Sequence, residues 1–268
     1  MQSVRELLNA VRSGKIGLKK AEQLLKLDAI EVVDSVARID YNRYLRRGVP
    51  EIIYARSKTT KQLLQILEKL IPKFEKNPDL LPIIVSKISE QQAERLLKSM
   101  ERKRKFAVRY FENADLLAIM PKKHSRSKHN KGKVALLAAG TSDMRALNES
   151  EIILNIFGCR TIRYNDVGVA GLHRLIQPLK EISVFDPDAI IVAAGMEGAL
   201  PSVVAGLSSV PVIGLPTSVG YGYGGDGEAA LMSMLQACSL GVCVVNIDAG
   251  VAAGVIAWLI ALRKNKSR

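Results

Sequence analysis

Ala189-Ile-Ile-Val-Ala-Ala194 is an uninterrupted apolar run, and it lies in the half of the chain that decides the fold. Further apolar or β-rich runs of strand length occur at 134–139, 161–164, 210–215 and 242–247. Segments with helical spacing of apolar residues separate these runs, at 143–157, 172–184, 200–207, 227–238 and 251–263. Strands that alternate with helices and are apolar on both faces indicate a parallel sheet covered on both sides. Residues 134–268 are therefore predicted to form a doubly wound, three-layer α/β domain.

The upstream half alternates in a similar way over shorter segments. Expected strands at 51–54, 81–85, 106–110 and 116–120, with helices at 59–71 and 90–99, indicate a smaller α/β domain. Apolar spacing predicts short helices at the start of the chain, then a helix from Asp28 through Val32, Val33 and Val36 toward Ile39. The expected organisation is an N-terminal α/β domain at 1–120, a linker at 121–133 and the larger domain at 134–268.

The excess of positive charge lies entirely in the first half of this 268-residue chain, whose net charge is +13. Residues 1–133 hold 30 Lys and Arg against 15 Asp and Glu, whereas residues 134–268 hold 9 against 11. The segment 121–133 has six Lys or Arg and no aliphatic side chain, which favours an exposed linker. Clustered cations can also neutralise nucleic-acid phosphates. No aromatic platform or nucleic-acid-binding motif accompanies them, so nucleic acid is the less favoured partner.

Cysteine usage and hydropathy indicate a cytoplasmic, soluble protein. The three cysteines, at 159, 238 and 243, are an odd number without paired spacing, and no apolar leader opens the chain. The uncharged tract at 249–262 is too short for a membrane span and predicts a buried helix. We expect Cys159 and Cys243 to be small buried side chains, and Cys238 to lie in a turn where its thiol can face a cleft.

Ligands bind doubly wound sheets beyond the carboxyl ends of the strands, so the loops that follow the strands hold the candidate site. Glycine and small polar residues crowd these loops, at 140–143, 166–174, 195–198, 216–225 and 246–250. Gly140, Thr141, Ser142 and Asp143 offer main-chain N–H groups and hydroxyls to an anion at a helix start. Alternatively, Ser142 only caps the helix. Neither a G-x-G-x-x-G motif nor a Walker lysine follows a strand, which argues against a conventional dinucleotide site or P-loop.

Four side chains near these loops are candidates for chemistry, each with a structural alternative. His173 is an acid–base candidate or a structural histidine. Glu197 can orient a ribose or a base, or cap the helix that follows. Asp248 can bind a divalent cation or a ribose hydroxyl. Cys238 is a candidate nucleophile, although a cysteine is more often a small buried side chain.

Several long motifs together resemble the carboxylase/hydrolase family of nickel-pincer cofactor biosynthesis, over nearly the whole chain. The motifs are Ala139-Gly-Thr-Ser-Asp143, Asp166-Val-Gly-Val-Ala-Gly-Leu-His-Arg174, Ala194-Gly-Met-Glu-Gly198, Pro216-Thr-Ser-Val-Gly-Tyr-Gly222, Val245-Asn-Ile-Asp248, Arg47-Gly-Val-Pro-Glu-Ile-Ile-Tyr54 and Lys58-Thr59. Residues 134–268 are also similar, more distantly, to aminoimidazole-ribonucleotide carboxylases and mutases. Two positions depart from the first family's pattern: Ala-Arg-Ser precedes Lys58, and Ala249 stands where Asn commonly follows.

The resemblance implies carboxylation of the pyridinium ring of nicotinic acid adenine dinucleotide and cleavage of its phosphoanhydride. The products would be pyridinium-3,5-biscarboxylic acid mononucleotide and AMP, with carbon dioxide or bicarbonate as co-substrate and Mg²⁺ or another divalent cation as helper. A homo-oligomer held through the C-terminal domain is also implied, with the last helix near Trp258 as a candidate contact.

Residue roles follow from the same resemblance. Cys238 matches the family cysteine and would add to the ring as a thiolate, while His173, Glu197 and Asp143 are alternative bases for removing the ring proton. Asp248 would hold the metal. Substrate contacts are assigned to Gly140, Thr141, Ser142, Asp166, Arg174, Gly195, Thr217, Ser218, Arg47, Glu51 and Lys58. The last three can instead form an exposed ion-pair cluster.

Two other functions remain open on the sequence alone. One is an aminoimidazole-ribonucleotide carboxylase or mutase, against which the extra N-terminal domain argues. The other is a nucleic-acid-binding or scaffold protein built on an inactive enzyme fold. Small polar residues at five strand ends favour an enzyme over a binding module.

Overall fold

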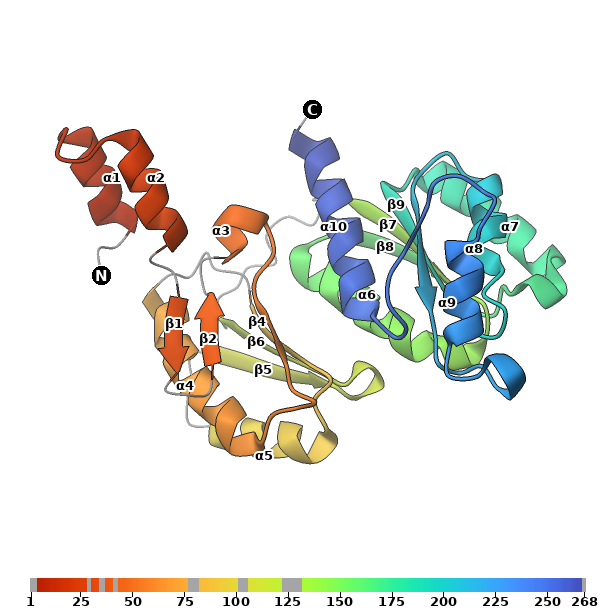
Figure 1. The fold of residues 1–268 in the computed structure, drawn as a ribbon, viewed down its shortest axis with the longest axis horizontal. Coiled ribbons are helices and arrows are strands. Elements are labelled where there is room, and N and C mark those ends of the chain that lie inside the picture. Colours follow the sequence, from red (N-terminus) through yellow and green to blue (C-terminus); the bar gives the residue numbers. More distant parts are fainter. Residues whose placement is uncertain are drawn as a thin grey trace. The chain divides into compact units, whose positions relative to one another are not determined.

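The computed structural model describes residues 4–27, 30–33, 37–40, 43–76, 82–100, 106–121 and 132–266. Two compact units divide the chain: unit 1 is Met1–Tyr110 with Leu116–His124, and unit 2 is Phe111–Asp115 with Ser125–Arg268 (Figure 1). Most of the expected linker, residues 122–131, lies outside the described residues. Its two ends belong to strands, with Pro121 in β6 and Lys133 in β7.

Unit 2 has the predicted doubly wound architecture. Its five parallel strands are β7 (Lys133–Ala138), β8 (Arg160–Tyr164), β9 (Ala189–Ala194), β10 (Val212–Pro216) and β11 (Val242–Val244), in the spatial order β11-β10-β9-β7-β8. The helices are α6 (Met144–Phe157), α7 (His173–Phe185), α8 (Leu200–Gly206), α9 (Glu228–Leu235) and α10 (Gly250–Lys266). Short 3-10 turns are η1 (Glu112–Ala114), η2 (Thr141–Asp143), η3 (Val169–Gly171) and η4 (Gly222–Gly224). The expected three-layer α/β domain is thus confirmed.

The two faces of the sheet are covered by different helices (Figure 1). Leu175, Leu200 and Met234 bring α7, α8 and α9 into one core with alternate residues of β7, β9 and β10. Helices α6 and α10 pack against the same strands and against each other. Because both faces of β9 are covered, every one of its residues is buried.

Helices α6 and α10 approach each other at glycines. A Cβ on Gly250 would lie 2.0 Å from the Ala146 carbonyl oxygen, and one on Gly254 would lie 3.0 Å from that of Ser150. The Ser150 hydroxyl donates a 2.7 Å hydrogen bond to the Gly250 carbonyl oxygen. Only glycine at these two positions allows the last helix to lie this close to the first helix of the unit.

Unit 1 is the smaller α/β part. Its mixed sheet has the order β3-β4-β6-β5, from β3 (Ile52–Tyr54), β4 (Ile83–Ser86), β5 (Phe106–Phe111) and β6 (Leu116–Pro121). Its helices are α1 (Val4–Arg12), α2 (Leu18–Leu27), α3 (Arg43–Arg47), α4 (Thr60–Lys76) and α5 (Glu90–Met100). Apolar residues of α4 and α5 form a core with one face of this sheet. The strands and helices expected from residue 51 to residue 120 are therefore confirmed.

One expected element of unit 1 is wrong. The predicted helix from Asp28 toward Ile39 is instead an antiparallel pair, β1 (Ile30–Val33) with β2 (Ala37–Asp40). Val33 and Ile39 are buried in the core that includes α4. Both are β-branched, and such side chains lose rotamer freedom in a helix but pack well on a pleated surface, so strand pairing outweighs the helical spacing.

Within the described segments, every helix is either too short or too polar to cross a membrane.

Candidate functional site

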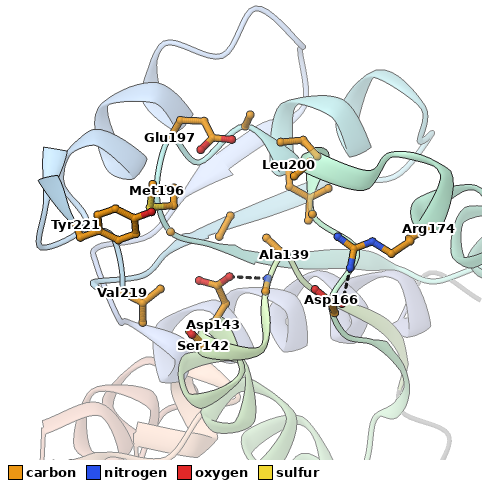
Figure 2. A pocket seen from close by; sticks show the side chains of 17 residues that line it. Ala139, Ser142, Asp143, Asp166, Arg174, Met196, Glu197, Leu200, Val219 and Tyr221 are labelled. Carbon is orange, nitrogen blue, oxygen red and sulfur yellow. Dashed lines mark hydrogen bonds and ion pairs between the residues drawn. The ribbon is translucent and has the colours of Figure 1, made fainter. Parts of the chain in front are cut away.

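A pocket of about 370 Å³ lies in unit 2 at the carboxyl ends of β7, β9 and β10, beside the loop that follows β8 (Figure 2). Seven of the predicted site residues line it: Gly140, Ser142, Asp143, Asp166, Arg174, Gly195 and Glu197. They come from three loops that are far apart in the sequence. Parallel topology brings these loops to one edge of the sheet, where a ligand site is expected.

Asp143 is the buried carboxylate of this edge, with only 5% of the residue exposed. One of its oxygens accepts a hydrogen bond from the Gly140 main-chain N–H at 2.8 Å, and the other accepts one from the Thr217 hydroxyl at 2.5 Å. Burial raises the pKa of Asp143, while hydrogen bonds from Thr217 and from the main chain of Gly140 and Gly195 lower it. Asp143 therefore connects the loops that follow β7, β9 and β10.

Gly195 fits closely against this carboxylate. A Cβ at this position would lie 2.9 Å from the Thr217 hydroxyl oxygen and 3.3 Å from an Asp143 oxygen. Any side chain here would push against the hydrogen bond between them. Glycine at position 195 is therefore required for the geometry around Asp143, and a contact of Gly195 with a substrate remains a prediction.

Asp166 and Arg174 form an ion pair at another side of the pocket (Figure 2). Asp166 has a left-handed backbone with φ of 59°. Gly171 lies against the guanidinium, since a Cβ there would be 2.7 Å from the Arg174 Nε. Both charged side chains remain partly exposed, with 39% of Arg174 and 54% of Asp166 accessible. A fixed, accessible guanidinium suits a phosphate or carboxylate ligand.

Glu197 lines the pocket from the turn after β9 and is exposed. The turn is built by Met196 with φ of 50° and Gly198 with φ of 62°. A Cβ on Gly198 would lie 2.7 Å from the Ala230 carbonyl oxygen, so glycine allows the turn to pack against α9. The structure thus presents the Glu197 carboxylate to the pocket, and within the described part of the chain no other side chain forms a hydrogen bond or ion pair with it.

Thr217, Ser218 and Asp248 support the site without lining the pocket. Thr217 is buried, and its hydroxyl group donates a hydrogen bond to Asp143. Ser218 donates to Asp248 through its hydroxyl at 2.5 Å and through its main-chain N–H at 3.1 Å. These bonds join the loops that follow β10 and β11.

A metal centre built by the protein alone does not fit this edge. Both oxygens of Asp248 accept hydrogen bonds from Ser218, and both oxygens of Asp143 are also occupied. No group of three or more His, Cys, Asp or Glu placed to hold a metal ion occurs among the described residues. A metal role for Asp248 remains a prediction from the sequence.

Thr141, His173 and Cys238 are exposed and do not line the pocket. Cys238 precedes β11, on the amino-terminal side of that strand, whereas the pocket residues follow their strands. Cys159 is buried as expected. The expectation of a buried Cys243 is wrong, because β11 is an edge strand of the sheet and leaves this residue exposed. Partial burial of its sulfur still raises the pKa of the Cys243 thiol.

Trp258 is not available as a contact between copies of the chain. Only 1% of the residue is exposed, and its ring centroid lies 5.4 Å from that of Phe157. A contact between copies through the last helix would therefore use other residues of α10 (Gly250–Lys266), and it remains a prediction.

Arg47, Glu51 and Lys58 belong to unit 1. Glu51 accepts a 2.5 Å hydrogen bond from the Asp40 main-chain N–H, and the half-buried Lys58 donates one of 2.9 Å to the Tyr54 carbonyl oxygen. Glu51 and Lys58 thus bond to main-chain groups, which differs from the exposed cluster of ion pairs considered as an alternative. Contacts of these three residues with a substrate remain predictions.

Sequence reasoning missed one side of the pocket. Met196, Val219 and Tyr221 line it, and 44%, 42% and 78% of these residues are exposed. They lie inside two of the quoted motifs, next to the polar residues that drew attention. The detectable signal was a tyrosine between glycines in a loop at a strand end.

Comparison with known proteins gives the family. The model described as AIR carboxylase matches residues 133–267, and the one described as a LarB/PurE-like N-terminal domain matches residues 30–122. An uncharacterised protein of Methanocaldococcus jannaschii is 39% identical over 263 residues, which are 97% of either chain. The N5-carboxyaminoimidazole ribonucleotide mutase of the same organism is 31% identical over 136 residues, 50% of this chain and 82% of that enzyme. The chain therefore belongs to the LarB family of LarB/PurE-like carboxylases.

Proposed function

We propose that this protein carboxylates the pyridinium ring of nicotinic acid adenine dinucleotide and hydrolyses its phosphoanhydride. The observation that carries the proposal is the combination of a LarB/PurE-like N-terminal domain with an AIR carboxylase domain whose pocket is lined by residues of the motifs at 139–143, 166–174, 194–198 and 216–222. The products are pyridinium-3,5-biscarboxylic acid mononucleotide and AMP. Carbon dioxide or bicarbonate supplies the new carboxyl group.

The anionic part of the dinucleotide suits the Arg174 side of the pocket. Arg174 is held by Asp166 yet remains accessible, and Ser142 lines the same pocket. A guanidinium and a hydroxyl placed before the reaction stabilise charge that develops on phosphate oxygens during cleavage. Hydrolysis adds the elements of one water across the P–O–P bond and leaves a phosphate on each half.

Ring carboxylation needs a nucleophile, because a pyridinium ring is too electron-poor to attack carbon dioxide. Addition of a thiolate to one ring carbon gives an enamine, whose neighbouring carbon forms the new C–C bond with carbon dioxide. A base then removes the proton from that carbon, the ring regains aromaticity and the thiolate leaves. Asp143 and Glu197 are the candidate bases that line the pocket, whereas the exposed His173 does not.

Cys238 is the proposed source of the thiolate, and its position suggests that a second copy of the chain supplies it. The residue is exposed and lies outside the pocket of its own chain. An exposed thiol can enter the pocket of a neighbouring copy in a homo-oligomer. We therefore propose a site shared between copies, which combines Cys238 of one with the pocket of another.

Magnesium is proposed as a helper that accompanies the substrate. Mg²⁺ commonly binds phosphate oxygens together with one or two protein carboxylates and keeps several waters. Since the described residues do not fit a metal centre of their own, no step is assigned to the ion.

The test is mass spectrometry of products after incubation with nicotinic acid adenine dinucleotide, bicarbonate and Mg²⁺. AMP together with a mononucleotide heavier by one carboxyl group is the expected result. Similarity to the N5-carboxyaminoimidazole ribonucleotide mutase favours one alternative, action on an aminoimidazole ribonucleotide. Turnover of that substrate, with the dinucleotide unchanged, would refute the proposed function.

A further inference from the structure

One end of the pocket is apolar and aromatic, and the opposite end carries the ion pair between Arg174 and Asp166. Figure 2 shows Met196, Val219 and Tyr221 on one side and Arg174 with Asp166 on the other. Building on the proposed function, we propose that the apolar end is a slot for the pyridinium ring. Tyr221 is its stacking platform and thereby a specificity residue for the substrate.

Glycine contacts place the three side chains of this slot. A Cβ on Gly220 would lie 3.3 Å from the Met196 main-chain nitrogen, so the segment that carries Tyr221 lies directly on the turn after β9. A Cβ on Gly195 would lie 2.8 Å from a Val219 methyl carbon. Gly195 and Gly220 thus allow the side chains of Val219, Met196 and Tyr221 to lie together at one end of the pocket.

Tyr221 leaves most of its surface available. With 78% of the residue exposed, it presents a large ring to the pocket, and no aromatic contact to it occurs among the described residues. A planar ring that enters the slot would cover this surface and contact Met196 and Val219 at its edges. Stacking on an aromatic side chain is a common way to hold a nucleotide ring.

The charge of the ring decides which half of the dinucleotide the slot accepts. The face of a tyrosine ring is electron-rich and attracts cations, so a positively charged pyridinium gains more from stacking than a neutral adenine. A ring in the slot also lies in the pocket lined by Asp143 and Glu197, the candidate bases. Its phosphate can then extend toward Arg174.

The chain offers a matched control at Tyr223. Tyr223 lies two residues away in the same glycine-rich loop, is fully exposed and does not line the pocket. Calorimetry without bicarbonate would measure binding of two separate probes, nicotinic acid mononucleotide and AMP. The variants are Tyr221→Ala, Tyr221→Phe and Tyr223→Ala.

We expect Tyr221→Ala to weaken binding of nicotinic acid mononucleotide by roughly tenfold to hundredfold, from the usual strength of aromatic stacking. Tyr221→Phe keeps the ring and stays within about threefold of the parent, as does Tyr223→Ala. Affinity for AMP does not change in any variant. Unchanged affinity for the mononucleotide in Tyr221→Ala, or a loss confined to AMP, would overturn the proposal.

Sedimentation of the same variants gives a second readout. An altered oligomeric mass with unchanged affinity would assign Tyr221 to a contact between copies and also overturn the slot. Failure of the parent protein to bind either the mononucleotide or the intact dinucleotide would instead defeat the proposed function itself. The two failures are therefore distinguishable.

Discussion

Replacing Thr217 by valine tests how the pocket holds its buried carboxylate. Valine has nearly the shape of threonine but cannot donate a hydrogen bond, so Thr217→Val removes the 2.5 Å hydrogen bond to Asp143. Only 1% of Thr217 is exposed, so water cannot replace the lost donor. A hydrogen bond to a charged acceptor contributes about 1.5–3 kcal/mol. The bonds from the main chain of Gly140 and Gly195 remain. We expect a loss of about 1–2 kcal/mol in the free energy of unfolding at neutral pH.

The loss depends on pH, and its sign follows from the pKa. Burial raises the pKa of Asp143 above 3.8, so ionisation of this group opposes folding as pH rises through the folded-state value. The Thr217 bond lowers that pKa, so Thr217→Val raises it further. The gap between parent and variant is therefore smallest at about pH 3, below the ordinary value of 3.8, where the carboxyl group is protonated in both proteins, and it widens toward about pH 7.

Denaturant unfolding followed by tryptophan fluorescence provides the assay, because the chain has one tryptophan and Trp258 is buried in unit 2. Thr217→Ser is the matched control: it keeps the hydroxyl and loses a buried methyl group, a change of about 1 kcal/mol with no pH dependence. If Thr217→Val lost the same free energy of unfolding at low pH and at neutral pH, the proposed bond to an ionised Asp143 would be refuted. The same pH dependence in Thr217→Ser would also refute it.

Three further predictions concern the same unit. Gly195→Ala should lower kcat/KM at least tenfold, because the added methyl group displaces the adjacent Asp143 carboxylate. Gly206→Ala should leave kcat/KM within about twofold, since its added Cβ meets nothing nearer than 3.7 Å, and equal rates in the two variants would contradict the steric argument. Cys238→Ala should abolish carboxylation, whereas Cys243→Ala should retain it. Mixed oligomers of Cys238→Ala with a pocket-defective variant should recover part of the activity, and inactive mixed oligomers would exclude a shared site. Arg174→Met should raise the KM for the dinucleotide by roughly tenfold to hundredfold, and the loss should shrink for a substrate without phosphoanhydride; an unchanged KM would remove the phosphate contact.

The strands of unit 2 could be predicted because they are buried on both faces. Each of β7, β9 and β10 is a nearly continuous apolar run, a pattern that few other structures produce. The same topology fixes which loops meet at the carboxyl edge. The convergence of Asp143, Arg174 and Glu197 on one pocket was therefore foreseeable from the sequence.

What could not be predicted depends on side-chain surroundings. Spacing suggested a helix where Val33 and Ile39 form paired strands, because three-residue spacing in a short segment does not exclude a hairpin. Thr217 was expected to contact the substrate, but it is buried against Asp143. Cys243 was expected to be buried and is exposed on the edge strand β11. In each case the deciding contact comes from a residue distant in the sequence.

The close approach of α10 to α6 has a consequence for synthesis of the protein. The last helix of the chain covers β7, β9 and β10, and its first residue, Gly250, lies against α6, the helix that follows the first strand of the unit. A nascent chain that has not yet reached Gly250 has only α6 on this face of the sheet, and the apolar surface that α10 covers stays exposed. This face of the sheet can therefore complete its packing only after residues 250–266 have been made, and until then its apolar surface is open to chaperones and to aggregation.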